Sequence, residues 1–147
     1  MVLRGNALAK IDVQGRIKIP TAHRKVLETE FGAEVFVTST DGESIRIYPL
    51  RKWEEIEAKL LSIQGVGLEK KRFMRVTSFY GQASSMDKQG RIVIQPHLRA
   101  DTQIDGEVAI IGNLTYLEVW NKDRVKRKLE TEPFTEEDEA ALSEAGL

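Results

Sequence analysis

The sequence predicts a mainly β protein with short helices, of the α+β class, built from two tandem copies of one small module. The first observation is an internal repeat, in which residues 11–19 match residues 86–94 at a constant offset. The second is the alternation of apolar and polar residues within each copy, which is typical of half-buried strands. The third is a composition of 41% hydrophobic residues without cysteine, so a packed core rather than a disulfide framework must hold the 147 residues together.

The repeat sets the boundaries of the modules. Two further pairs of segments match after a small slip of register: residues 34–37 with 107–110, and residues 45–48 with 117–120. We therefore expect one module over residues 6–53, a second over residues 81–124, and a helical, acidic tail over residues 125–147. A module of four short strands cannot bury both of its faces alone. The two copies are therefore expected to pair about a pseudo-twofold axis and interleave their strands into one barrel.

The start of each module predicts a hairpin followed by a helical turn. In both copies a Gln-Gly pair, ending at Gly15 and Gly90, precedes a strand, where glycine supplies the positive φ of a tight turn. Proline follows both strands and ends them, because it cannot donate to a ladder. Short helical turns are then expected over residues 21–27 and 96–100, and Asp41-Gly42 predicts another hairpin in the first copy.

A longer helix is expected between the modules. Apolar residues recur at steps of three or four from residue 50 to residue 63, and Gly65 and Gly67 are expected to end the helix. The apolar face around Trp53 should pack inside the subunit or between subunits. The basic stretch of residues 69–75 predicts a second short helix.

The charge is unevenly distributed along the chain. The net charge is −1, but residues 130–147 hold seven acidic residues and no lysine or arginine, which leaves 22 basic and 16 acidic residues in residues 1–129. A basic body keeps nucleic acid among the possible partners. The tail is expected to be a solvated helix, because Thr135 and Asp138 can form a capping box. The alternative is that it folds over a basic surface or keeps assemblies from sticking.

Catalysis and metal binding find little support in the sequence. Asp12 and Asp87 could form a paired-carboxylate site only if the pseudo-symmetry brought them together. His23 and His97 fall one step out of register between the copies, and neither has a second potential ligand nearby. There is also no glycine-rich phosphate loop and no serine-centred nucleophile motif. We expect a protein that is not an enzyme and has no cofactor, metal or small-molecule ligand.

Membrane insertion and secretion are not expected either. No uncharged apolar run approaches the roughly 18 residues that a membrane span needs. The first residues lack the apolar stretch of a signal peptide. The expectation is a cytoplasmic protein without a membrane partner.

The repeated Asp-x-x-x-Arg loops favour DNA binding. Arginine recognises guanine through two hydrogen bonds in the major groove, glutamine can contact base edges, and lysine suits phosphates. The candidate DNA-binding residues are Arg16, Arg91, Gln14, Gln89, Lys10, Lys18 and Lys88. The candidate loop-structuring residues are Asp12, Gly15, Asp87 and Gly90. The alternative is that both arginines only pair with the aspartates and hold the turns.

Two such loops with glycine before the arginine resemble the SpoVT/AbrB-type swapped-hairpin fold, and the whole chain resembles the MraZ family. The matching segments are Arg4-Gly5, residues 12–20 with Arg24, residues 48–54, residues 87–91, Leu98-Arg99, Gly112-Asn113 and residues 117–120. The resemblance covers residues 3–126 and leaves out the acidic tail.

The resemblance implies a fold and a function. The fold would be two tandem SpoVT/AbrB-like repeats that form a pseudo-twofold swapped-hairpin β-barrel, followed by the helical tail. The function would be sequence-specific binding of double-stranded DNA by a transcriptional regulator of a bacterial division and cell-wall gene cluster. Its targets would be short G-containing direct repeats, including those of its own promoter. It would act in the cytoplasm and nucleoid as a homo-oligomeric ring of about eight or more subunits. Arg16 and Arg91 would contact DNA, and Asp12 and Asp87 would brace them.

The alternative function belongs to another class. A swapped-hairpin module can serve as a protein-interaction scaffold, as in antitoxins that dimerise through this fold and neutralise a toxin with an added tail. The acidic tail favours this alternative, whereas the presence of two copies in one chain speaks against it.

Overall fold

The computed structural model describes residues 2–147. Over these residues the chain forms eight strands, six α-helices and one π-helical turn. The first half contains β1 (Asn6–Lys10), β2 (Arg16–Lys18), α1 (Thr21–Val26), η1 (Leu27–Phe31), β3 (Glu34–Thr38), β4 (Ile45–Pro49), α2 (Leu50–Ser62) and α3 (Gly67–Tyr80). The second half contains β5 (Gln82–Ser85), β6 (Arg91–Val93), α4 (Pro96–Thr102), β7 (Glu107–Gly112), β8 (Leu117–Asn121), α5 (Lys122–Thr131) and α6 (Glu136–Glu144).

The strand order has the pseudo-twofold symmetry that the repeat predicts. Six strands form one sheet in the order β1-β7-β8-β4-β3-β5, and β2 pairs with β6 in a separate two-stranded ribbon. When each strand is replaced by its equivalent in the other copy, the same order is read backwards. β1 pairs with β7 of the other copy, and β5 pairs with β3, so the two copies exchange their first strands. The α+β class and the interleaving are therefore confirmed.

The expected barrel is not confirmed. β1 and β5 are the two edges of the six-stranded sheet, and the ladders described for residues 2–147 do not join them into a closed ring. The ribbon instead lies against the sheet through its buried face. Ile17 and Ile92 lie opposite each other at its centre, are fully buried, and belong to the same core cluster as Val35, Ile45 and Val119 of the sheet. Both copies thus build one core.

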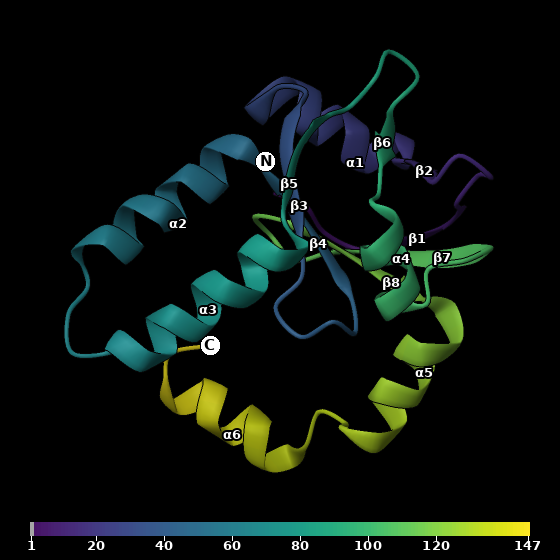
Figure 1. Cartoon of the computed structure of the whole chain (residues 1–147). Coiled ribbons are helices and arrows are strands. Elements are labelled where there is room, and N and C mark those ends of the chain that lie inside the picture. Colours follow the sequence, from purple (N-terminus) through teal and green to yellow (C-terminus); the bar gives the residue numbers. More distant parts are fainter. Residues whose placement is uncertain (1) are drawn as a thin grey trace.

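Two helical arms leave this core, as Figure 1 shows: α2 and α3 extend to one side, and α5 and α6 curve along the lower edge. Trp53 fixes the base of the first arm. It is buried and stacks on Phe36 with 4.6 Å between ring centroids, and it also contacts Phe73 of α3. The end of this arm is uncovered, since Leu61 is 88% exposed. Trp53 therefore packs inside the subunit, as one of the two sequence-based alternatives had it.

Several helix boundaries differ from the prediction. α2 ends at Ser62, and Gly67 begins α3 instead of ending the first helix. The first N–H groups of a helix have no intrahelical partner, so glycine is tolerated at that position. α3 is longer than the predicted residues 69–75 and runs to Tyr80. The turn that begins at Thr21 continues beyond the expected residue 27 as the π-helical turn η1.

The helices at the end of the chain follow the sequence signals. The Asn121 side chain accepts a hydrogen bond from the Arg124 N–H at 3.0 Å and caps α5. Thr135 and Asp138 form the predicted capping box at the start of α6. Among residues 2–147, none of the helices combines the length and the hydropathy that a membrane span requires.

Candidate nucleic-acid interface

Each Asp-x-x-x-Arg loop is organised by its aspartate. Asp12 Oδ1 accepts the backbone N–H groups of Gln14 at 3.0 Å and Arg16 at 2.8 Å. Asp12 Oδ2 accepts the Arg16 Nε–H at 2.8 Å. The second loop repeats the pattern, with Asp87 accepting both the backbone N–H and the Nε–H of Arg91 at 2.8 and 3.0 Å. In each loop the aspartate side chain thus fixes the turn and holds the Nε edge of the arginine guanidinium.

The glycines give each loop its shape. Gly15 and Gly90 have φ angles of 80° and 79°, a conformation that other residues rarely adopt. A side chain at either position would also collide with an arginine: a Cβ on Gly15 would lie 2.8 Å from the Arg99 guanidinium, and one on Gly90 would lie 2.8 Å from Arg24 Cδ. Each turn therefore has little room for a side chain, and its φ angle would strain the backbone of any residue other than glycine.

Each loop is held by the opposite copy. Arg24 of the first copy donates from Nη2 to the Lys88 carbonyl at 2.6 Å, and Arg99 of the second copy lies against Gly15. The backbone adds reciprocal bonds, because the Ile94 N–H donates to the Gly15 carbonyl at 2.8 Å and the Ile19 N–H does the same to Gly90. The 75-residue offset of the repeat also relates Arg24 to Arg99, but the sequence does not show what these two arginines contact. Their equal spacing was the available signal.

The hydrogen bonds keep both aspartates ionised. The backbone N–H of Arg16 lowers the pKa of Asp12, further helped by the Arg16 side chain and outweighing the opposing effect of desolvation. The Arg91 N–H lowers the pKa of Asp87 in the same way. The antiparallel ribbon places the two loops at its opposite ends, so the paired-carboxylate arrangement required for acid–base catalysis does not form.

The outer face of the ribbon gathers the cations. Arg16 lies opposite Val93, and Lys18 lies opposite Arg91. Residues opposite each other on an antiparallel pair point to the same face, and Ile17 and Ile92 occupy the buried one. The two arginine side chains are each 29% exposed. Within residues 2–147, their Nη1 and Nη2 atoms have no hydrogen-bond partner.

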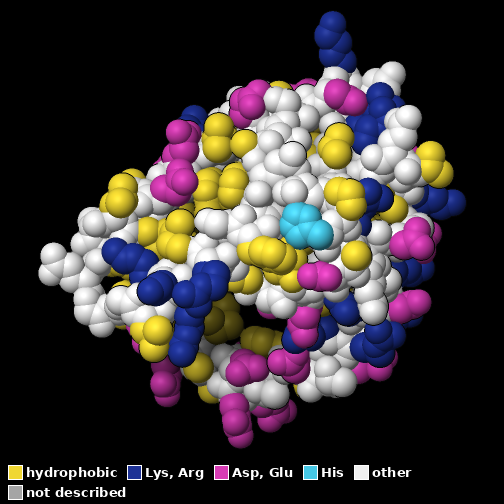
Figure 2. Space-filling view, viewed as in Figure 1, with side chains coloured by type: hydrophobic (Ala, Val, Ile, Leu, Met, Phe, Trp, Pro, Cys, Tyr) yellow, Lys and Arg dark blue, Asp and Glu magenta, His cyan; other side chains and the backbone are white. Residues whose placement is uncertain are grey.

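The other predicted site residues lie around this face. Lys10 and Lys18 line one shallow depression of about 410 Å³ beside the ribbon. Gln14, Lys88 and Gln89 are exposed in the loops, which extend in different directions in Figure 1. A basic side chain stands out from the tip of the upper loop in Figure 2. The two tips differ chemically, because the fully exposed Val13 occupies the place of Lys88.

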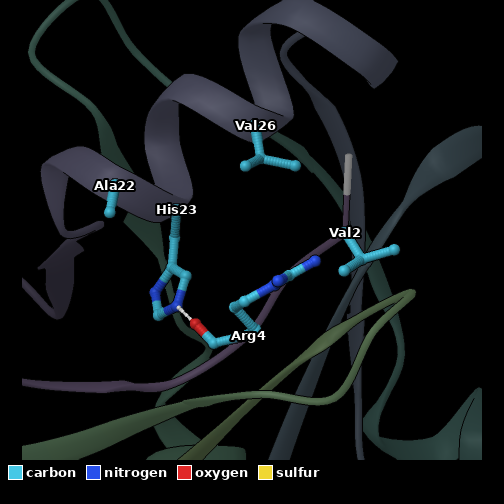
Figure 3. A pocket seen from close by; sticks show the side chains of 5 residues that line it. All are labelled: Val2, Arg4, Ala22, His23 and Val26. Carbon is cyan, nitrogen blue, oxygen red and sulfur yellow. Dashed lines mark hydrogen bonds between the residues drawn. The ribbon is translucent and has the colours of Figure 1, made fainter.

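The two histidines do not form a metal site. His23 is buried in α1, and its Nε2 lies 2.9 Å from the Arg4 carbonyl at a pocket of about 260 Å³ (Figure 3). His97 contacts a different carbonyl, that of Phe79, at 3.0 Å. The described part of the chain contains no cluster of three or more histidine, cysteine, aspartate or glutamate residues placed to hold a metal.

The loop aspartates should make stability depend on acid pH. Because the pKa of Asp12 in the fold lies below its ordinary value of 3.8, its hydrogen bonds stabilise the fold above that pH and are lost as pH falls through the lowered value. Asparagine keeps an acceptor for the backbone but cannot pair with the guanidinium. The double variant Asp12→Asn, Asp87→Asn should therefore lose less stability between pH 7 and pH 3 than the wild type.

Urea unfolding at both pH values measures this difference. Asp105→Asn is the matched control, since Asp105 is exposed and has no hydrogen bond or ion pair within the described residues. An acid dependence equal to that of the wild type in the double variant would show that the loop carboxylates contribute nothing.

Comparison with known proteins places this geometry in a family. The family model described as "MraZ protein, putative antitoxin-like" matches residues 2–75 and 81–144. The proteins named Transcriptional regulator MraZ of Acidobacterium capsulatum and Koribacter versatilis are each 40% identical, over 146 and 147 residues, which cover 99% of this chain and all of each relative. The one of Syntrophobacter fumaroxidans is 36% identical over 119 residues, 81% of this chain and 79% of the relative.

The family model matches a longer part of the chain than we expected from the resemblance in the sequence. We expected it to end near residue 126, but the family model runs to residue 144 and includes α6. The acidic helix therefore lies within the matched residues, together with both Asp-x-x-x-Arg loops. With both modules matched and relatives aligned along their whole length, the chain belongs to the MraZ family.

Proposed function

We propose that this protein is a transcriptional regulator that binds specific double-stranded DNA through the outer face of the β2–β6 ribbon. Its sites are short G-containing direct repeats in the promoter of a bacterial division and cell-wall gene cluster that includes its own gene. It acts in the cytoplasm, associated with the nucleoid, as a homo-oligomeric ring. The names of the relatives support regulation of transcription. The observation that carries the proposal is the cationic face formed by Arg16, Lys18 and Arg91.

The ribbon suits the major groove. The major groove of B-DNA is wide enough to admit a two-stranded antiparallel ribbon, and β-ribbon proteins use this geometry. The buried isoleucines anchor the ribbon to the core, so its outer face is presented by a rigid support. A side chain that is already fixed loses little conformational freedom on binding, which favours affinity.

The aspartates determine which edge of each arginine reads a base. Asp12 occupies the Nε edge of Arg16, which leaves the two terminal nitrogens to donate to guanine O6 and N7. Arg91 has the same arrangement with Asp87. The pairing that the sequence left as an alternative to DNA binding is thus compatible with it, since the aspartate orients the arginine without using its terminal donors.

The other residues on and around the ribbon contact phosphates and base edges. Lys18 on the ribbon, Lys10 on β1 and Lys88 at a loop tip suit phosphates. Gln14 and Gln89 suit base edges. The apolar Val13 suits a thymine methyl group. The two loops would therefore read different sequences. A ring that presents many such ribbons gains avidity on direct repeats, because each further contact is intramolecular.

A mobility-shift assay tests the proposal. The probe is the DNA just upstream of the protein's own gene, with random DNA as competitor, over a series of salt concentrations. We expect binding that survives the competitor and weakens steeply with salt, as phosphate contacts require. Absence of specific binding even at low salt would contradict the proposal.

The alternative is a protein-interaction scaffold of the antitoxin type. The exposed acidic helix α6 favours it, and so do the words "putative antitoxin-like" in the description of the matching family model. The same assay separates the two functions, because a scaffold would show little affinity for DNA at any salt concentration.

A further inference from the structure

One helical arm carries an excess of basic residues. α3 holds Lys70, Lys71, Arg72 and Arg75, and only Glu69 opposes them on the same helix. Within residues 2–147, none of these four cations forms an ion pair, and Lys70 Nζ donates a hydrogen bond to the Ile63 carbonyl at 3.3 Å. We call these four residues the basic face of α3.

The other arm carries the opposite charge. Glu136, Glu137 and Glu139 lie in the first turn of α6, and Glu144 lies at its end. Within the described residues, these glutamates form no ion pair. The capping box of Thr135 and Asp138 satisfies the N–H groups of the first turn locally. Every residue from 132 to 147 is exposed.

Apolar side chains accompany the charges on both arms. A groove of about 430 Å³ between α2 and α3 is lined by Leu60, Leu61 and Met74, by Lys70 of the basic face, and by Glu57 of α2. α6 exposes Leu142, which is 43% accessible. Groups of opposite charge beside exposed apolar surface are typical of protein interfaces, in which charge sets partner and orientation.

The two surfaces do not neutralise each other within one chain. Figure 2 shows basic side chains over α3 and acidic side chains below them, separated by an opening. No hydrogen bond or ion pair joins α3 and α6 among the described residues. The charges are complementary, and the partner that fits each surface is therefore a second copy of this chain.

We propose that α6 of one subunit docks on the basic face of α3 and the adjacent groove of the neighbouring subunit. Because the two surfaces differ, a subunit can place its α6 on one neighbour and receive α6 of another on its α3. Such heterologous contacts close into a ring when the rotation between subunits allows it. The inference rests on the ring of the proposed function and supplies its interface. It leaves the outer face of the β2–β6 ribbon free for DNA.

Charge reversal tests the contact without DNA. The arm variant is Lys71→Glu, Arg72→Glu, Arg75→Glu, and the tail variant is Glu136→Lys, Glu137→Lys, Glu139→Lys. Sedimentation velocity should show that each variant falls to smaller species under conditions in which the wild type is assembled. Combining both sets in one chain should restore the assembly. The combined variant also shows whether α6 still forms, since lysines in its first turn oppose the helix dipole.

A second set of bases provides the matched control. Lys25→Glu, Lys126→Glu, Arg127→Glu reverses three exposed cations that form no ion pair within the described residues, and it should leave the assembly unchanged. Arm and tail variants that keep the wild-type mass would overturn the inference. A combined variant that does not reassemble would do the same.

Engineered cysteines identify which chain supplies α6. The chain has no cysteine, so single Lys71→Cys and Glu137→Cys variants can be mixed and oxidised without background. A disulfide-linked heterodimer is expected, whereas Asn6→Cys in place of Glu137→Cys should give little. A disulfide that forms only when both cysteines are in one chain would show closure within the subunit and overturn the proposal.

The outcomes separate this inference from DNA binding. If the assembly is unchanged by charge reversal and the protein still binds its promoter, the proposed interface is wrong and the proposed regulator stands. If the assembly depends on these charges but the protein does not bind its promoter, the proposed interface stands and the proposed regulator is wrong.

Discussion

Replacing Arg16 by alanine should weaken binding to promoter DNA by about 5- to 150-fold and leave the fold intact. A two-bond contact between arginine and guanine contributes about 1–3 kcal/mol of discrimination, which corresponds to that range. Arg16 is partly exposed, and its terminal nitrogens are free of protein partners within residues 2–147. Its removal takes a partner from one oxygen of Asp12, which is itself partly exposed. The measurement is the affinity for specific and random DNA in parallel.

Four further variants show which property of Arg16 is responsible for the loss. Arg16→Lys keeps the charge but loses the paired donors, so specific binding should fall while binding to random DNA persists. Lys18→Ala should instead weaken both kinds of DNA alike and reduce the salt dependence. Arg127→Ala removes an equal charge from α5 and should change neither. Arg91→Ala tests whether the second loop reads DNA as well. If Arg16→Ala unfolds the protein, the arginine has a structural function only.

The loops were predictable because their chemistry is local. An aspartate, a glycine and an arginine within five residues determine a turn, and its repetition in the chain marked it as a module. The exchange of strands followed from the inability of each short module to bury both faces. The same reasoning overestimated closure, since β1 and β5 remain edges of an open sheet.

The features that sequence analysis missed depend on contacts between distant segments. Arg24 supports the loop at Lys88, and this contact exists only because β2 and β6 pair across the two copies. The start of α3 at Gly67 was missed because glycine ends helices more often than it begins them. The unpaired charges of α3 and α6 were visible as composition, but only the structure shows that they remain apart.

Truncating either central isoleucine of the ribbon should destabilise the fold by about 2–5 kcal/mol, the usual cost of removing a large aliphatic side chain from a core. Ile17 and Ile92 are both fully buried and lie directly opposite each other, so Ile17→Ala and Ile92→Ala should cost similar amounts. The destabilisation of the double variant should differ from the sum of the two single effects, because the two side chains are in contact in the same part of the core. Urea unfolding at a fixed protein concentration measures all three.

Val93→Ala is the control on the opposite face of the same ribbon. Val93 is 50% exposed, so its truncation should change the stability by less than about 0.5 kcal/mol. A cost as large as that of Ile17→Ala would mean that the outer face is covered in the assembled protein. That face would then be closed to DNA, because Val93 lies opposite Arg16 on it. The stability experiment therefore tests the binding surface as well as the core. If Val93→Ala changes the free energy of unfolding little and Ile17→Ala lowers it strongly, Arg16 and Arg91 are available to contact bases.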